Sequence, residues 1–261
     1  MYTLGIDIGS TTSKCAVLKD GTELVGKSLQ RGGLGTDGPA EALAALWRSC
    51  GLTRADMTRT VVTGYGRKNY QGADSEISEL TAHALGGRFV FPDLRTVIDI
   101  GGQDAKVIAL TPSGRMSNFV MNDKCAAGTG RFLDVMASIL GMDVDELGDC
   151  AAQATAPAAI SSTCTVFAES EVITLVGEGK PMDEIAAGIQ MAVAKRCFVM
   201  SKKAGATDAI TLTGGCAKNA GLKQAIEHVL KLKVIDLKTD PQLMGALGAA
   251  EYARQKGMAR V

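Results

Sequence analysis

"LGIDIGSTTSKCAVL", residues 4–18, decides how this chain folds, because "VIDIGGQDAKVIAL", residues 97–110, repeats its pattern. When the two stretches are superimposed, Asp7 and Lys14 fall on Asp99 and Lys106. Each copy has an apolar run, a short glycine-containing turn and a second apolar run, so the sequence predicts two β-hairpins. Glycine suits such a turn because the backbone there must approach another group closely and adopt conformations that other residues disfavour.

The two predicted turns have the composition of a phosphate-binding site. Successive backbone N–H groups in a turn form a nest for anionic oxygens, and hydroxyl side chains add further donors. An aspartate would repel phosphate directly, so Asp7 and Asp99 are interpreted as ligands of a hydrated Mg²⁺ that the phosphates also bind. Lys14 and Lys106 either neutralise phosphate charge or are solvated. The residues predicted to contact phosphate are Gly9, Ser10, Thr11, Thr12 and Ser13 in the first turn and Gly101 and Gly102 in the second.

Two polar residues of the second turn are candidates for catalysis of phosphate cleavage. Gln103 and Asp104 follow the two glycines and carry oxygens that can accept a hydrogen bond from water. Either side chain could orient a water molecule for attack on a terminal phosphate, and the sequence does not choose between them. We therefore predict hydrolysis of a bound polyphosphate that depends on one residue of this pair.

A third glycine-rich segment, "AITLTGGCAKNAGLKQAIEHVL" at residues 209–230, predicts a strand, a Gly-Gly turn and a helix that begins near Asn219. Alone this pattern is weak evidence, but after two phosphate hairpins it suits an adenosine pocket. Cys216 lies in the turn and is interpreted as a small space-filling residue. The residues predicted to bind the nucleoside are Gly214, Gly215, Lys218 and Asn219.

Two more segments, 75–87 and 244–253, predict helices with small-residue faces. Glycine inside a helix costs about 1 kcal/mol relative to alanine, so a packing reason is needed. The close crossing of two helices supplies one, although an ordinary tight pair within one core would explain the same composition. The small residues are Ala82 and Gly86 in the first segment and Gly245, Gly248 and Ala249 in the second.

Seven cysteines are too many to leave unexplained, and their odd number argues against a disulfide framework. Four of them continue apolar patterns and are interpreted as small buried residues: Cys15, Cys50, Cys150 and Cys197. Besides these four and Cys216, two remain: Cys125 in "NDKCAAGTGRFLD" and Cys164 in "SSTCTVFAESEV", which precede predicted helices. We expect each to lie in the first turn of its helix or immediately before it, where free N–H groups favour a thiolate.

Three interpretations of Cys125 and Cys164 compete. Buried structural cysteines are disfavoured by polar neighbours, which predict exposed loops: Asn122, Asp123, Lys124, Ser161, Ser162 and Thr163. A catalytic thiol would need a base, and both histidines lie in other segments. A metal centre would need more ligands, because zinc sites and iron–sulfur clusters commonly take four from the protein. A two-fold dimer would supply four thiolates, but the spacing alone leaves the three interpretations open.

Taken together, the hairpins, the Gly-Gly turn and the two small-residue helices resemble the actin, Hsp70 and sugar-kinase superfamily of nucleotide-binding proteins. The resemblance implies an α/β class protein with a two-lobed actin-like (ribonuclease H-like) ATPase fold and a duplicated βββαβα core. Lobe I would comprise residues 1–94 and a C-terminal helix over 243–261, and lobe II residues 95–242. In that superfamily the two connecting helices cross between the lobes and act as a hinge.

The two cysteine segments, with "GIDIGSTTSK" and "VIDIGGQDAKVI", resemble more closely the activators of 2-hydroxyacyl-CoA dehydratases. The wider family includes ATPase subunits of benzoyl-CoA reductases. The resemblance implies a homodimer that shares one 4Fe–4S cluster through Cys125 and Cys164 of each subunit and that binds ATP or ADP with Mg²⁺. It also implies that ferredoxin or flavodoxin supplies an electron, which ATP hydrolysis helps to pass to the dehydratase for ketyl-radical dehydration in anaerobic amino-acid fermentation.

Composition restricts the other functional classes. With 28 basic and 28 acidic residues, the chain lacks the clustered basic excess of a nucleic-acid-binding protein. No run approaches the roughly 20 apolar residues of a membrane span, and no signal peptide is recognised, so we expect a cytoplasmic protein without membrane contact. Three alternatives stay open: a small-molecule kinase, a nucleotide-switched scaffold or filament protein, and a dimer that holds zinc in place of the cluster.

Overall fold

The chain divides into two compact units in a computed structural model that describes residues 1–161 and 164–258. Unit 1 comprises residues 1–94, 111–116 and the chain from 237 onward. Unit 2 comprises residues 95–110 and 117–236. None of the helices in the described part of the chain is long and apolar enough to cross a membrane.

Unit 1 is built on a five-stranded sheet in the order β3-β2-β1-β4-β5. β1 runs antiparallel to β2 and parallel to β4, so the first predicted hairpin is the β1–β2 pair, with Asp7 opposite Lys14. Helix α1 packs against β2 and β3, and helix α8 packs against β1, β2 and β4. The strands are β1 (Tyr2–Ile8), β2 (Thr12–Lys19), β3 (Glu23–Arg31), β4 (Met57–Thr63) and β5 (Ser75–Glu76), and the helices are α1 (Gly38–Cys50), α2 (Glu79–Val90) and α8 (Met244–Met258).

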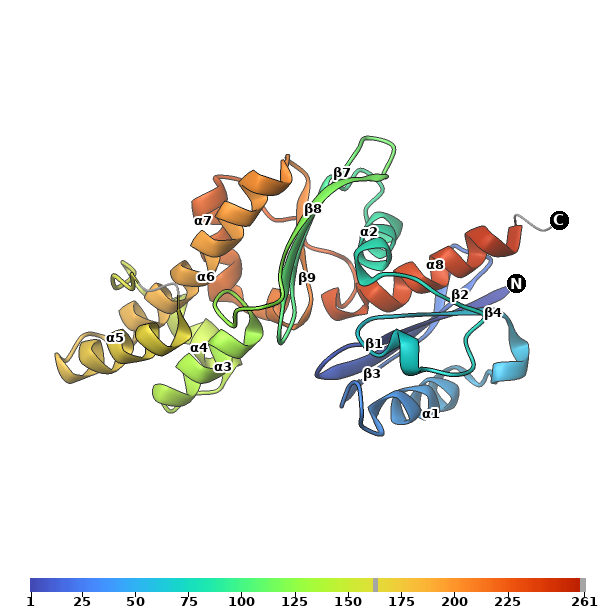
Figure 1. Ribbon diagram of the computed structural model, residues 1–261, viewed down its shortest axis with the longest axis horizontal. Coiled ribbons are helices and arrows are strands. Elements are labelled where there is room, and N and C mark those ends of the chain that lie inside the picture. The colour runs from blue at the N-terminus through green and yellow to red at the C-terminus, as the bar shows by residue number, and fades with distance from the viewer. Residues whose placement is uncertain (162–163, 259–261) are drawn as a thin grey trace. The chain divides into compact units, whose positions relative to one another are not determined.

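Helices α2 and α8 cross closely within unit 1, as their small residues predict (Figure 1). A Cβ atom on Gly248 would lie 1.7 Å from the carbonyl oxygen of Ala82, so only glycine fits at this contact. The predicted start of the first helix was wrong. Residues 75–76 form the short edge strand β5, and α2 begins at Glu79 because Ser78 caps it by accepting a hydrogen bond from Thr81 N.

Unit 2 is built on a four-stranded sheet in the order β8-β7-β6-β9, with β6 antiparallel to β7 and parallel to β9. The second predicted hairpin is the β6–β7 pair, with Asp99 opposite Lys106. Figure 1 shows the helices of this unit gathered on one side of the sheet. The elements are β6 (Thr96–Ile100), β7 (Ala105–Leu110), β8 (Met116–Asn122), α3 (Gly130–Ile139), α4 (Val144–Ala151), α5 (Thr165–Gly177), α6 (Met182–Ala204), β9 (Ile210–Thr213) and α7 (Ala220–Leu230).

Both units follow one plan, which confirms the predicted duplicated βββαβα core. Three antiparallel strands are followed by helix, by a strand parallel to the first, and by a further helix. Unit 2 differs because four helices, α3 to α6, occupy the position of the single helix α1 in unit 1. Both cysteines of interest lie in this enlarged region of unit 2.

The cysteines interpreted as small core residues follow that prediction to different degrees. Cys15, Cys197 and Cys216 are buried, whereas Cys50 and Cys150 are only partly buried. Burial raises the pKa of each of the three buried thiols to about 12, so all three stay neutral at physiological pH.

Candidate functional site

The first hairpin presents a polar turn at the end of β1. Asp7 is buried, and Lys14 Nζ lies 3.3 Å from its Oδ2 atom. Gly9 N donates to Thr12 O at 3.0 Å and closes the turn, which leaves Ser10 and Thr11 at its surface. Ser13 differs from its neighbours because its side chain is fully buried and its hydroxyl donates to Gly32 O at 2.8 Å. Its hydroxyl therefore supports the fold instead of facing a ligand.

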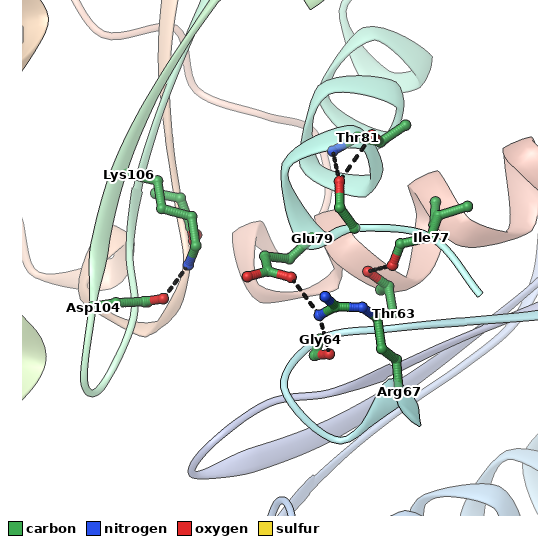
Figure 2. Close-up of polar contacts among 10 residues, drawn as sticks. Thr63, Gly64, Arg67, Ile77, Glu79, Thr81, Asp104 and Lys106 are labelled. Atoms are coloured by element: carbon green, nitrogen blue, oxygen red, sulfur yellow. Dashed lines mark hydrogen bonds and ion pairs between the residues drawn. The ribbon is translucent and has the colours of Figure 1, made fainter. Parts of the chain in front are cut away.

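The second hairpin is built in the same way but carries more charge. Gly101 N donates to Asp104 O at 2.9 Å, which closes the turn. Lys106 is buried, and its Nζ lies 3.4 Å from Asp99 Oδ2 and 2.6 Å from Asp104 Oδ2 (Figure 2). Thr213 Oγ1 donates to the other oxygen of Asp99 at 2.8 Å. Two carboxylates and one ammonium group leave this cluster with a formal negative charge, which suits a nearby cation.

The two candidates for orienting water have different surroundings. Gln103 is exposed on the turn, whereas Asp104 is buried and paired with Lys106. A buried carboxylate that already balances an ammonium group is poorly suited to approach a water molecule. The geometry therefore favours Gln103, a choice that the sequence left open.

The Gly-Gly turn follows β9 and continues as a short 3-10 helix over Gly215–Lys218, and α7 begins at Ala220 with Asn219 as its N-cap, as predicted. Gly214 has φ +83°, and a Cβ atom there would lie 2.4 Å from Ile100 O, so glycine is required. Gly215 and Lys218 are exposed. Asn219 is buried: its Oδ1 accepts from Leu222 N, and its Nδ2 donates to Val144 O. Its side chain therefore caps α7 and ties it to the start of α4.

Sequence reasoning missed a matching turn in unit 1. "VTGYGRK" at residues 62–68 has the Thr-Gly pair and the final lysine of "LTGGCAK" at residues 212–218, and this similarity was the available signal. Gly64 has φ +85°, and a Cβ atom there would lie 2.4 Å from Ile8 O, as at Gly214. Figure 2 shows Arg67 Nη1 donating to Gly64 O at 3.0 Å and to Glu79 Oε2 at 2.9 Å.

Cys125 lies in a loop that Asn122 holds closed. Asn122 is buried and donates through Nδ2 to the carbonyl oxygens of Cys125 and Ala127, both at 2.9 Å. The predictions of an exposed Asn122 and of a cysteine at a helix start were therefore wrong here. Helix α3 begins at Gly130 with Thr129 as its N-cap, and the intervening residues form the loop that Asn122 closes.

Cys164 lies where the sequence predicts it, as the exposed N-cap residue of α5. Upstream, Ser161 donates through its backbone N and its hydroxyl to the carboxylate of Glu171, at 2.8 and 2.7 Å. The predicted loop residues Ser162 and Thr163 lie outside the described residues. Helix α3 packs against α5, and Gly128 and Ser161 line the same small cavity, so the two cysteine-bearing segments lie close together.

Two hydrogen bonds join the second hairpin to the start of α3, directly after the Cys125 loop. Gly130 N and Arg131 N, the first amides of α3, donate to the carbonyl oxygens of Gly101 and Gly102, both at 2.8 Å. A Cβ atom on Gly130 would lie 3.1 Å from Gly101 O, so the contact is tight. The turn that is predicted to bind phosphate therefore rests on the start of the helix that follows Cys125.

Comparison with known proteins accounts for this combination of features. The model of the BadF/BadG/BcrA/BcrD ATPase family matches residues 4–253. The chain belongs to this family. It is 51% identical over 259 residues to the (R)-2-hydroxyglutaryl-CoA dehydratase activating ATPase of Acidaminococcus fermentans, which covers 98% of each chain. The resemblance to dehydratase activators is thereby confirmed.

Solved structures give the same answer for the fold. The activator of the 2-hydroxyisocaproyl-CoA dehydratase from Clostridium difficile, with bound ADPNP, matches with TM-score 0.95 and 50% identity over 100% of this chain and 97% of that chain. A ROK family glucokinase from Streptomyces griseus matches with TM-score 0.59 and 12% identity over 98% of this chain and 100% of that chain, which bears on the fold alone. The predicted actin-like ATPase fold is confirmed.

Cys125 and Cys164 are the residues of this ATPase family member that could hold a cluster. Among residues 1–161 and 164–258, no three or more histidine, cysteine or acidic residues are grouped to hold a metal ion. One chain supplies two suitable thiols, and two chains would supply four. Helix α5, which Cys164 caps, exposes the apolar side chains of Val166, Phe167, Ile173 and Val176. Such a surface suits contact with a second copy.

Proposed function

We propose that this chain is the ATP-hydrolysing activator of a 2-hydroxyacyl-CoA dehydratase. In this role it accepts one electron from a ferredoxin or flavodoxin and passes that electron to the dehydratase, which uses it for ketyl-radical dehydration. The observation that carries the proposal is the pair of hydrogen bonds from Gly130 and Arg131 to Gly101 and Gly102. They connect a phosphate-type turn to a cysteine loop, which a kinase or a filament protein would not need.

The nucleotide half of the proposal assigns roles to the two hairpins. Asp7 and Asp99 hold Mg²⁺ through water, and the turn amides and hydroxyls contact the phosphates of ATP. Lys14 and Lys106 balance the charge of these carboxylates, as their ion pairs indicate. The phosphate-contacting residues are Gly9, Ser10, Thr11, Thr12, Gly101 and Gly102, and the nucleoside-contacting residues are Gly214, Gly215 and Lys218.

Gln103 orients the attacking water in this proposal. Its amide can accept a hydrogen bond from water and donate one to a phosphate oxygen, and it is exposed on the turn. Orientation of water by a glutamine is an established solution in nucleotide hydrolysis. Asp104 keeps Lys106 in place beside Asp99, so its contribution is to position the charges of the hairpin.

The electron-transfer half of the proposal depends on the cysteines of two subunits. Cys125 and Cys164 of each copy would hold one 4Fe–4S cluster at the two-fold axis of a homodimer. When bound, the cluster would supply a one-electron store of low potential. Asn122 fixes the loop of the first cysteine, and Glu171 fixes the segment that leads to the second. In this proposal the activity takes place in the cytoplasm.

The coupling between the two halves follows from the contact at α3. Loss of the terminal phosphate would remove ligands from the turn at Gly101 and Gly102 and change its preferred position. Because the carbonyl oxygens of this turn accept hydrogen bonds from the first amides of α3, the start of α3 and the loop that contains Cys125 would respond. ATP hydrolysis and the environment of the cysteine are thereby linked energetically.

Anaerobic purification with iron, sulfide and zinc analysis tests this proposal. We expect a homodimer that contains about four iron and four sulfide ions and that hydrolyses ATP without a small-molecule acceptor. Cys125→Ala and Cys164→Ala should each abolish the iron while leaving ATP binding intact. A colourless dimer without iron would support a nucleotide-switched scaffold, and bound zinc would support the zinc alternative. Turnover that requires a phosphate acceptor would indicate a kinase.

A further inference from the structure

A small cavity lies between the two cysteine-bearing segments and helix α6. Its volume is about 170 Å³, and all of its lining residues belong to unit 2. Ala127 and Gly128 line it from the Cys125 loop, and Ile160 and Ser161 line it from the segment before Cys164. The opposite wall is one face of α6, with Ala192, Lys195, Arg196 and Val199. A group that enters this cavity therefore contacts the segments that are adjacent in sequence to both cysteines.

Arg196 gives the cavity its chemistry. Its Nε is buried and has no hydrogen-bond partner among residues 1–161 and 164–258. An unpaired buried donor is unfavourable, so an acceptor that reached it would be bound favourably. The aliphatic part of the side chain packs under the Cys125 loop, where a Cβ atom on Gly128 would lie 2.8 Å from Arg196 Cγ. This packing limits the freedom of the aliphatic part of the Arg196 side chain.

The charges around the cavity favour an anion. Lys195 lines the cavity beside Arg196 and is exposed, so its amine adds a second positive charge. On the neighbouring helix α5, the carboxylate of Glu171 accepts both hydrogen bonds from Ser161. Its oxygens are thus directed to the segment before Cys164. The lining residues are either uncharged or cationic, so Lys195 and Arg196 favour an anion in the cavity.

We propose that this cavity receives an acidic side chain of the electron-donor protein. The lining combines two cations with the apolar side chains of Ala127, Phe132, Ile160, Ala192 and Val199, which suits the apolar stem and carboxylate of an aspartate or glutamate better than it suits a free phosphate. Val199 is also exposed, so apolar protein surface continues at the rim. This inference rests on the proposed function, because it identifies where the electron donor docks.

Binding of a flavodoxin of net negative charge tests the proposal. The oxidised flavodoxin would be titrated into the cluster-loaded dimer by anaerobic calorimetry, at low and at high salt. Arg196→Gln and Lys195→Gln should each raise the Kd about tenfold at low salt and weaken its salt dependence. Lys203→Gln, the same charge change in the last turn of α6, serves as the matched control and should leave the Kd unchanged. Arg196→Lys should lose part of the affinity, because an ammonium group lacks the fork of a guanidinium.

Other outcomes would overturn the proposal. Equal flavodoxin affinity in the wild type, Arg196→Gln and Lys195→Gln would exclude this cavity as the docking point. Loss of dehydratase binding alone would assign the cavity to the electron acceptor instead, and displacement of flavodoxin by millimolar acetate or phosphate would indicate a site for free anions. Reduction by dithionite separates this inference from the proposed function. If the dimer contains no cluster that dithionite reduces, the proposed function fails. If the cluster is reduced but the Arg196 and Lys195 variants bind the donor as the wild type does, only the docking site is contradicted.

Discussion

The two hairpins share a backbone design but differ in what supports them. In each, the aspartate of the first strand pairs with a lysine of the second, at 3.3 Å for Asp7–Lys14 and 3.4 Å for Asp99–Lys106. In each, a glycine carbonyl at the turn accepts a hydrogen bond from another segment. Gly9 O accepts from Leu34 N at 3.0 Å, in the loop that leads to α1. Gly101 O accepts from the first amide of α3, directly after the Cys125 loop.

This difference indicates that one copy is specialised. The first turn is supported by the loop over residues 32–34, whereas the second turn is supported by the element that follows a cysteine proposed to bind the cluster. The side chains of the two turns also differ. Thr11 and Thr12 of the first turn correspond to Gln103 and Asp104 of the second. These two substitutions add a candidate catalytic amide and a second carboxylate for the buried lysine, so the proposed function assigns both the chemistry and the coupling to the second hairpin.

The largest expected difference between the hairpins is in stability. Lys106→Met would leave the buried carboxylates of Asp99 and Asp104 without their cation, so we expect a loss of about 3–5 kcal/mol in the free energy of unfolding. Lys14→Met leaves one carboxylate unpaired and should lose about 1–3 kcal/mol. Urea unfolding in the presence of EDTA measures both, and addition of Mg²⁺ should restore part of each loss. Equal losses in the two variants would show that the additional carboxylate of Asp104 does not increase the dependence of stability on the lysine.

The second-largest expected effect is on the rate of ATP hydrolysis. Gln103→Thr gives the second turn the residue that the first turn has at this position, and we expect ATP turnover to fall about a hundredfold because the attacking water is no longer oriented. The Kd for ATP should stay within about threefold, since the turn amides are unchanged. Single-turnover hydrolysis and nucleotide titration measure the two quantities. Loss of ATP binding would contradict the assigned role, and Thr11→Ser in the first turn is the control that should alter neither.

A smaller effect should reveal the connection to the cysteine loop. Gly130→Ala places a methyl group 3.1 Å from Gly101 O, so we expect a loss of about 1–3 kcal/mol and a displaced start of α3. ATP should then change the rate of iron release from the cluster to a chelator less than it does in the wild type. Gly177→Ala, at the end of α5, has nothing within 4 Å and no positive φ, so it should leave the response to ATP unchanged. A normal response in Gly130→Ala would exclude this route of coupling.

The fold could be predicted from the sequence because it depends on short-range patterns. The strand–turn–strand repeats fixed both hairpins, and Gly86 and Gly248 predicted the crossing of α2 and α8. The same local reasoning failed at β5, because a two-residue edge strand depends on pairing with β4, which no pattern near residue 75 reveals.

The candidate site could be predicted only in part. Residue types pointed to Cys164 as a helix cap, but the loop around Cys125 depends on Asn122, whose amide satisfies two carbonyl groups in the fold. Its polarity alone suggested exposure. The choice between Gln103 and Asp104 likewise required the ion pair with Lys106, and the unpaired Nε of Arg196 is a property of packing. Contacts between distant segments, such as Gly101 with Gly130, decide these features.

The smallest expected effect comes from the second strand of the first hairpin. Cys15 occupies the position that Val107 has in the second hairpin, and burial raises the pKa of its thiol from 9.0 to about 12. Because the folded state holds this proton more tightly than the unfolded state, the stability that it contributes is complete below pH 9 and is lost as the pH rises toward 12. Cys15→Val removes this dependence. At pH 8 we expect this variant to lose less than about 1.5 kcal/mol in the free energy of unfolding. Above pH 9 its free energy of unfolding should rise relative to that of the wild type by up to about 1.4 kcal/mol for each pH unit. Urea unfolding of both proteins at pH 8 and pH 10.5 measures the difference, and parallel losses would show that the Cys15 proton is not linked to folding.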